Sequence, residues 1–94
     1  MLKKNIDENG FGRLEYRDYF LTYSDELAQD ILAVYKISIE NLFVILVDNF
    51  LEHRQQTLNL APYDDIGLIN FTVTFKILED SEVQIQIKKN IIAV

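Results

Sequence analysis

The chain has 94 residues, 49% of them hydrophobic and 26% charged, which is enough for one folded domain and excludes a disordered chain. Its 9 Lys and Arg residues are outnumbered by 15 Asp and Glu residues, and the net charge of −6 disfavours a general nucleic-acid-binding surface. Because cysteine is absent, disulfides, thiolate zinc sites and cysteine nucleophiles are excluded as well.

Residues 1–12 are predicted to form an N-terminal arm and a turn. No apolar stretch of signal-peptide length follows Lys3 and Lys4, and the longest apolar run, Leu42 to Val47, is too short to span a bilayer. We therefore expect a soluble, intracellular protein that does not interact with a membrane.

The stretch from Asp7 to Asp18 partly matches the spacing of oxygen ligands in a helix–loop–helix calcium loop, with Gly12 at the position of the sharp turn. Phe11 stands where a ligand oxygen is needed, however, and too few residues precede the loop for an incoming helix. The alternative is a glycine-rich turn that leads into an aromatic segment.

Residues 13–56 contain no glycine or proline and are predicted to be mainly helical. Ser24, followed by Asp25 and Glu26, is typical of a helix start, and Ser38 can cap a second helix. Apolar residues recur at helical spacing after both serines. Two separate helices and one long bent helix both fit this pattern.

After Arg54 the apolar residues change from helical spacing to alternation, which indicates strands. Alternation is clearest over 71–77 and 83–87, with one turn expected over 79–82 and another over 62–65. We therefore predict a single α+β domain, in which N-terminal helices pack on a C-terminal three-stranded antiparallel meander formed by residues 57–94.

The segment from Asp18 to His53 carries seven acids and one base, Lys36, and therefore holds the whole net charge of the chain. Two interpretations are open. The acids form either a solvated helical face or an acidic patch that binds a basic partner or mimics DNA.

Few residues could carry catalysis. The sole histidine, His53, has no second histidine or cysteine with which to share a metal ion, and carboxylate pairs such as Asp64 and Asp65 lie in expected turns or caps. The sequence has no phosphate-binding loop and no dinucleotide fingerprint. We expect neither an enzyme nor a bound metal or cofactor.

The sequence Glu52-His53-Arg54, at the end of the second predicted helix, resembles the Glu-Pro-Arg triplet of the sheath-initiator family of contractile tails and injection systems. These are baseplate wedge proteins, historically described as lysozyme-like. In that family the triplet ends a helix and precedes a three-stranded meander. A Phe-Gly pair lies upstream of a Leu, comparable to Phe11-Gly12-Arg13-Leu14. Here a histidine replaces the central proline of the triplet.

The resemblance implies a structural baseplate component that is cytoplasmic before assembly and then part of a virion tail or injection system. It implies that Glu52 and Arg54 bind the helical core of the wedge, and that an edge strand accepts an arm of the sheath subunit by β-strand addition. The implied partners are the sheath subunit and the wedge and tube proteins of a symmetric assembly. The expected edge strand alternates without a charge: Val83, Gln84, Ile85, Gln86 and Ile87.

An alternative function fits the size and the charge equally well. A small acidic inhibitor or immunity protein would bind and block a basic protein partner. Its binding surface would be the acidic helical face, with Asp25, Glu26 and Asp30.

Overall fold

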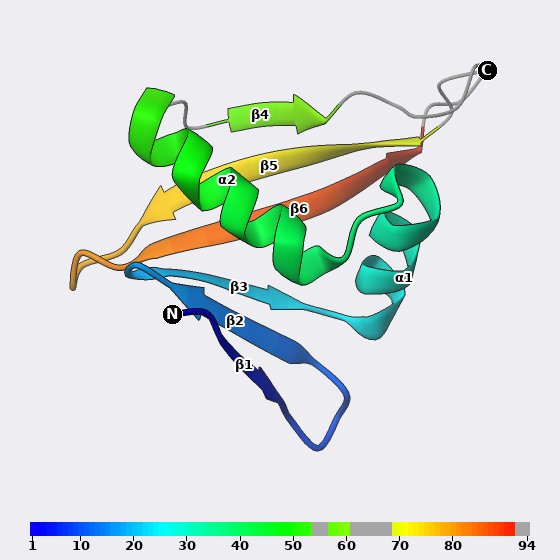
Figure 1. The fold of residues 1–94 in the computed structure, drawn as a ribbon, viewed down its shortest axis with the longest axis horizontal. Helices are drawn as coiled ribbons and strands as arrows, with labels where there is room; N and C mark the ends of the chain where they lie inside the picture. Colours follow the sequence, from blue (N-terminus) through cyan, green and yellow to red (C-terminus); the bar gives the residue numbers. More distant parts are fainter. Residues whose placement is uncertain (54–56, 61–68, 92–94) are drawn as a thin grey trace.

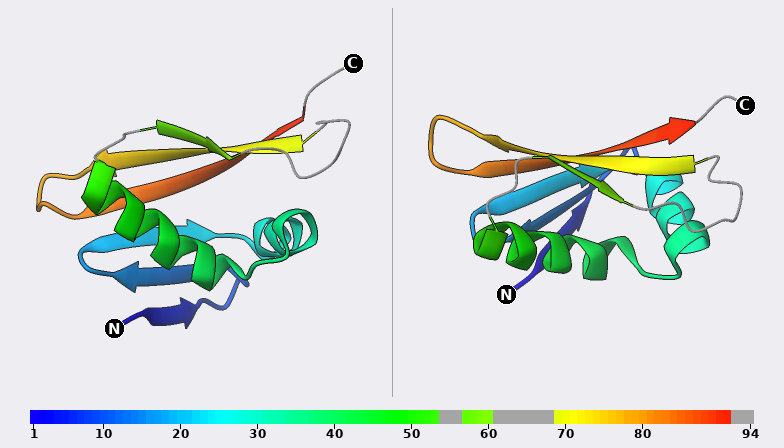
Figure 2. Two further views of the ribbon diagram at one scale, coloured as in Figure 1. Left: turned by 45° about the horizontal axis from the view of Figure 1, so that its top comes forward. Right: turned by 90° about the horizontal axis from the view of Figure 1, so that it is seen from above.

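The computed structural model describes residues 1–53, 57–60 and 69–91, which form six strands and two helices (Figure 1). The strands make one mixed sheet in the order β1-β2-β3-β6-β5-β4, and both helices lie on the same side of it (Figure 2). We call that side of the sheet the inner face and the other side the outer face. In chain order the elements are β1 (Lys3–Ile6), β2 (Gly12–Tyr16), β3 (Tyr19–Tyr23), α1 (Asp25–Tyr35), α2 (Ile39–His53), β4 (Thr57–Leu60), β5 (Ile69–Ile77) and β6 (Val83–Ile91).

The first 23 residues form an antiparallel meander of three strands, which corrects the prediction of an arm, a turn and the start of a helical segment. Leu14 of β2 lies opposite Leu21 of β3, and both side chains are fully buried. Arg17 and Asp18 make the turn between these strands with φ angles of 53° and 67°. A tight hairpin therefore forms without glycine, and the absence of glycine does not signal a helix here.

Both predicted helix starts are confirmed. The Ser24 hydroxyl accepts a hydrogen bond from the backbone N–H of Leu27 (3.1 Å), and the Ser38 hydroxyl accepts one from Asn41 (3.2 Å). Between them Lys36 adopts a left-handed conformation with φ of 59°, which ends α1. The chain therefore forms two helices rather than one bent helix.

Beyond α2, β4 pairs with β5 and β5 pairs with β6, in both cases antiparallel. The expected turn between β5 and β6 is confirmed, because the N–H of Ser81 donates to the carbonyl of Leu78 (3.1 Å) and Ser81 has a φ of 69°. The turn expected over 62–65 lies outside the described residues.

The prediction of a three-stranded antiparallel meander as the whole sheet is wrong. Residues Tyr19 to Leu21 of β3 pair in parallel with Val83 to Ile85 of β6, and this junction joins the N-terminal strands to the C-terminal strands. Because β3 and β6 lie far apart in the chain, no short stretch of the sequence indicates that they pair. Alternation identifies β5 and β6 as strands, but it does not identify their neighbours.

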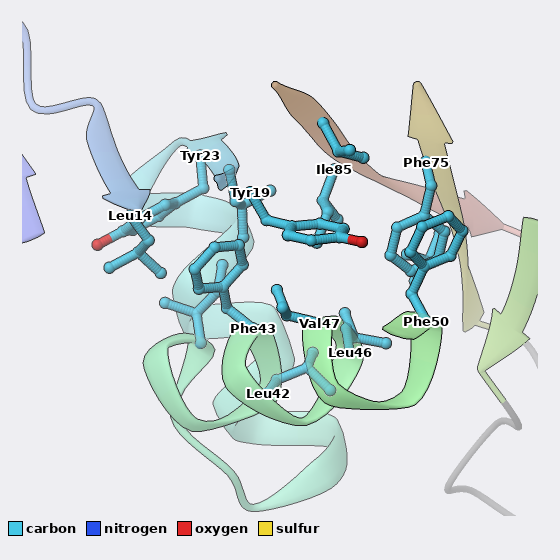
Figure 3. Close-up of a cluster of buried hydrophobic side chains, with 14 of the residues drawn as sticks. Leu14, Tyr19, Tyr23, Leu42, Phe43, Leu46, Val47, Phe50, Phe75 and Ile85 are labelled. Atoms are coloured by element: carbon cyan, nitrogen blue, oxygen red, sulfur yellow. The ribbon is translucent and has the colours of Figure 1, made fainter. Parts of the chain in front are cut away.

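The core lies between α2 and the inner face of the sheet (Figure 3). Phe50 of α2 stacks on Phe75 of β5, with ring centroids 4.4 Å apart, and meets Tyr19 of β3 edge-on at 5.6 Å. One helical side chain therefore contacts both halves of the sheet. The largest fully buried side chains are Phe43, Phe71, Leu14, Leu21, Ile31, Leu46, Ile85, Val47 and Val73.

Candidate functional site

Of the triplet singled out by the family resemblance, Glu52 and His53 lie at the end of α2. Glu52 is exposed in the last turn of this helix, and His53 is its final residue. Arg54 lies outside the described residues. The contact of Glu52 and Arg54 with a wedge protein therefore stays a prediction.

The sequence predicts an edge strand over Val83–Ile87, and the structure corrects this for Val83, Gln84 and Ile85, whereas Gln86 and Ile87 pair only with β5 among the described strands. β6 lies between β3 and β5, so that Val83, Gln84 and Ile85 are paired on both sides. Their alternation separates side chains on the buried inner face from side chains on the outer face of an interior strand. A partner strand cannot add to these three residues.

The edges of the described sheet are β1 and β4. In β1 all four side chains, from Lys3 to Ile6, are exposed, and β2 is the only strand in the described sheet that pairs with it. Figure 1 places β1 at the border of the molecule, with no described element beyond it. β1 therefore offers an open edge for pairing.

The hydrogen bonds of the β1–β2 hairpin indicate which backbone groups of β1 are free. Near the turn, the N–H of Asp7 donates to the carbonyl of Phe11 (2.9 Å). Bonded and non-bonded pairs alternate along an antiparallel ladder, so Lys3 and Asn5 bond to β2. Lys4 and Ile6 therefore direct their N–H and carbonyl groups away from β2, toward the open edge.

Asp7 organises the turn of this hairpin. Its Oδ1 atom accepts hydrogen bonds from the N–H groups of Asn9 and Phe11, both at 2.9 Å, and Gly10 has a φ of 85°. Asp18 lies in the next turn, at the other end of β2, so the two acids do not form the calcium loop considered above. No group of three or more potential metal ligands occurs among the described residues.

On the inner face, a groove of about 180 Å³ runs between the hairpin and α1. Ile6 of β1 and Leu32 of α1 line it, and they are 62% and 50% exposed. Gly12 and Tyr23 also line the groove. The Tyr23 ring lies so close that a Cβ atom on Gly12 would stand 2.2 Å from the Tyr23 Cζ atom. The groove thus presents exposed apolar surface beside the open edge, next to polar side chains that include Asp25 and Glu40.

An ion pair fixes β1 to the helices on this face. The Lys4 ammonium lies 2.7 Å from Oε1 of Glu40 in α2. The hydrogen bond between them raises the pKa of Lys4 and lowers the pKa of Glu40. The inner lysine of the edge therefore already has a counter-ion.

The outer face beside the edge carries charges of both signs, because Arg13 lies near both Glu15 and Glu82. The guanidinium of Arg13 covers the Phe20 ring at 4.1 Å from its centroid, and its Nε atom lies 2.9 Å from Oε1 of Glu15. A shallow depression here is lined by Lys3, Lys4, Asn5, Arg13 and Glu15. Within the described residues Lys3 forms no ion pair, so its charge is available to a partner.

The acidic segment is partly neutralised within the molecule. Asp30 of α1 lies 2.9 Å from the Lys89 ammonium of β6, and Glu40 is held by Lys4. Asp25 and Glu26 lie exposed in the first turn of α1, where the helix dipole favours acids.

Sequence reasoning missed β1 altogether. Asn9-Gly10 is a dipeptide typical of hairpin turns, but the prediction places it in a turn at the end of an N-terminal arm rather than between two strands. The segments that flank it are short, and Lys4, which lies between Leu2 and Ile6 in the inner-face series, hides the alternation of apolar residues.

Comparisons with protein-family models, with curated proteins and with solved structures found no match for this chain. Neither helix in the part of the chain that the structure describes is long and apolar enough to cross a membrane.

Proposed function

We propose that this chain is a structural, protein-binding component of a contractile phage tail or injection system, a baseplate sheath initiator, and that it accepts an extended partner segment as an additional strand on β1. The class of assembly comes from the resemblance of Glu52-His53-Arg54 to the family triplet. The observation that carries the binding mode is the open edge of β1, with the backbone groups of Lys4 and Ile6 directed outward.

Strand addition suits this edge for a physical reason. Backbone hydrogen bonds to Lys4 and Ile6 would supply affinity that does not depend on sequence, while side chains on alternate faces would select the partner. The edge is held in place by its pairing with β2 and by the Lys4–Glu40 ion pair. A pre-organised strand loses little conformational entropy on binding.

The class of assembly is tested by affinity purification of the tagged chain from its native lysate, read by mass spectrometry. We expect sheath, tube and wedge subunits together. Glu52→Lys and Arg54→Glu should each abolish recovery of the wedge subunit, because an Arg–carboxylate joint is directional. Glu79→Lys, a reversal in the exposed β5–β6 turn, is the matched control. Full recovery with both reversals would contradict the assignment of these residues.

The binding mode is tested at Ile6. Ile6→Pro removes an N–H that points to the open edge, and proline is tolerated at such positions of edge strands. Ile6→Val keeps the N–H and the branched side chain. We expect recovery of the sheath subunit to be lost with proline and kept with valine, while circular dichroism of both variants stays that of the wild type. Equal recovery would contradict strand addition on β1.

The acidic inhibitor remains a second candidate, because Asp25 and Glu26 lie exposed at the start of α1. The same purification would then recover one basic toxin, nuclease or defence enzyme in place of tail subunits. Asp25→Asn with Glu26→Gln should weaken that complex and reduce its dependence on salt. An unchanged affinity and salt dependence would exclude the acidic face.

A further inference from the structure

We propose that the segment added to β1 carries an apolar residue and an acidic residue three positions apart, on opposite faces of the incoming strand. This inference rests on the proposed strand addition and specifies its partner. It follows from the different chemistry of the two faces of the edge.

The inner face of the edge selects an apolar side chain. An added strand continues the pleat of the sheet, so the residue opposite Ile6 lies on the inner face beside the groove. Ile6 and Leu32 together leave much of their surface open to water there. An apolar side chain seated between them would remove this surface from water.

The outer face of the edge selects an acid. Lys3 lies on the outer face with no ion pair in the described residues, whereas the nearby Glu15 is already engaged by Arg13 at 2.9 Å. A carboxylate opposite Lys3 would therefore meet one unpaired cation beside the Arg13–Glu15 ion pair. A lysine or arginine in that position would be repelled.

The spacing follows from the positions of these two residues in β1. Lys3 and Ile6 are three residues apart and lie on opposite faces of the strand. A paired strand places its own residues at the same separation, whether it runs parallel or antiparallel. Opposite Lys4 no acid is needed, because Glu40 already neutralises that lysine.

The same argument excludes a second copy of this chain as the occupant. Pairing two β1 strands would place Lys3 of both copies on one short edge, with no acid of β1 to meet either of them. Lysines on an edge strand are a known protection against such self-association. An acidic strand converts this repulsion into attraction, which makes the edge selective.

Three end-blocked peptides test the proposal in titrations of the full chain labelled with ¹⁵N, read from the backbone amide shifts of residues 3–6. The first is Asp-Thr-Thr-Val-Thr-Thr-Asp, which presents the required spacing in both strand directions. In the second, lysines replace the aspartates. The third, Thr-Asp-Thr-Val-Thr-Asp-Thr, keeps the charge of the first but moves the acids to the same face as the valine.

We expect the first peptide to bind about tenfold more tightly than either of the others. Lys3→Glu should reverse the preference between the first and second peptides. Lys76→Glu, a reversal of an exposed lysine on interior strand β5, should leave the preference unchanged.

The outcomes separate this inference from the proposed function. Equal binding of acidic and basic peptides at residues 3–6 would overturn the selection of an acid while leaving strand addition in place. Equal binding of the first and third peptides would overturn the spacing. If no peptide shifts the amides of residues 3–6, strand addition on β1 is overturned together with this inference.

Discussion

Tyr19 of β3 and Val83 of β6 are paired at the start of the parallel junction that joins the two halves of the sheet. The junction is short, from Tyr19 to Leu21. On each side of it, strands that follow one another in the chain pair in antiparallel fashion. Phe50 of α2 packs across it, against Tyr19 and Phe75. The two halves of the sheet are therefore joined by this short pairing and by core side chains of α2 that pack on both.

We predict that small losses of packing at this junction destabilise the whole domain. Ile85 pairs with Leu21 and is 1% exposed, so Ile85→Val should lower the free energy of unfolding by about 1 kcal/mol. Ile91→Val makes the same change at the far end of β6, where the side chain is 75% exposed, and should cost less than about 0.5 kcal/mol. Urea unfolding followed by circular dichroism measures both. Equal effects would contradict the role given to the junction.

Local features of this fold were predictable from the sequence, and the sheet topology was not. Ser24 and Ser38 act through hydrogen bonds within three residues, so their caps could be identified directly. Arg17 and Asp18 form a turn that no glycine marks, and the strands on either side of it were therefore assigned to a helical segment. Apolar and polar residues do alternate in β2. The absence of glycine and proline from the segment nevertheless favours a helix in the prediction.

The edge strand was predicted in the wrong place for a related reason. Val83 to Ile87 alternates as an exposed edge strand would, but interior strands of a sheet with one covered face alternate in the same way. Whether a strand lies at an edge depends on which strands pair with it. For β6 the deciding neighbour is β3, which lies far away in the chain. Only the complete sheet order identifies β1 as open.

Gly12 is predicted to be required because of Tyr23. A Cβ atom at this position would stand 2.2 Å from the Cζ atom of the Tyr23 ring, so Gly12→Ala should cost about 1–3 kcal/mol through forced displacement of the ring. In a Tyr23→Leu background the same substitution should cost less, because the colliding atoms are gone. A double-mutant cycle in urea measures the difference.

Gly10 supplies the control for that experiment. No atom lies within 4 Å of a Cβ placed there, but its φ of +85° is unfavourable for alanine. Gly10→Ala should therefore cost about 1 kcal/mol in both backgrounds. A cost at Gly12 that Tyr23→Leu does not relieve would refute the steric explanation.

Asp7 is predicted to stabilise the β1–β2 turn and to bind no calcium. Its Oδ1 atom accepts hydrogen bonds from Asn9 and Phe11, so Asp7→Ala should lower the free energy of unfolding by about 1–2 kcal/mol. Asp7→Asn keeps an acceptor oxygen and should lose less. The melting temperatures of the wild type and both variants should not change on addition of calcium. A calcium-dependent rise that Asp7→Ala removes would restore the calcium-loop interpretation.

The ion pair between Lys4 and Glu40 gives the β1 edge a predictable dependence on pH. The pKa of Glu40 is lowered from its usual value of about 4.3, so its contribution to stability is complete above that pH. The contribution is lost as the pH falls through the lowered pKa. The pKa of Lys4 is raised from about 10.4, so its contribution is complete below that pH and is lost as the pH rises through the raised pKa.

The difference in free energy of unfolding between the wild type and Glu40→Gln isolates this contribution. It should be constant between about pH 5 and pH 10, shrink toward both extremes, and diminish in high salt, because the pair is only partly shielded from solvent. Glu79→Gln changes an exposed acid in the β5–β6 turn, and its difference from the wild type should stay near zero across the range. Glu40→Gln also leaves the Lys4 ammonium without its counter-ion, so an acid opposite Lys4 should become favourable in this variant. The third peptide, whose acids lie on the same face as its valine, should therefore gain affinity relative to the first peptide in Glu40→Gln. An unchanged preference between these two peptides would contradict the neutralisation of Lys4 by Glu40.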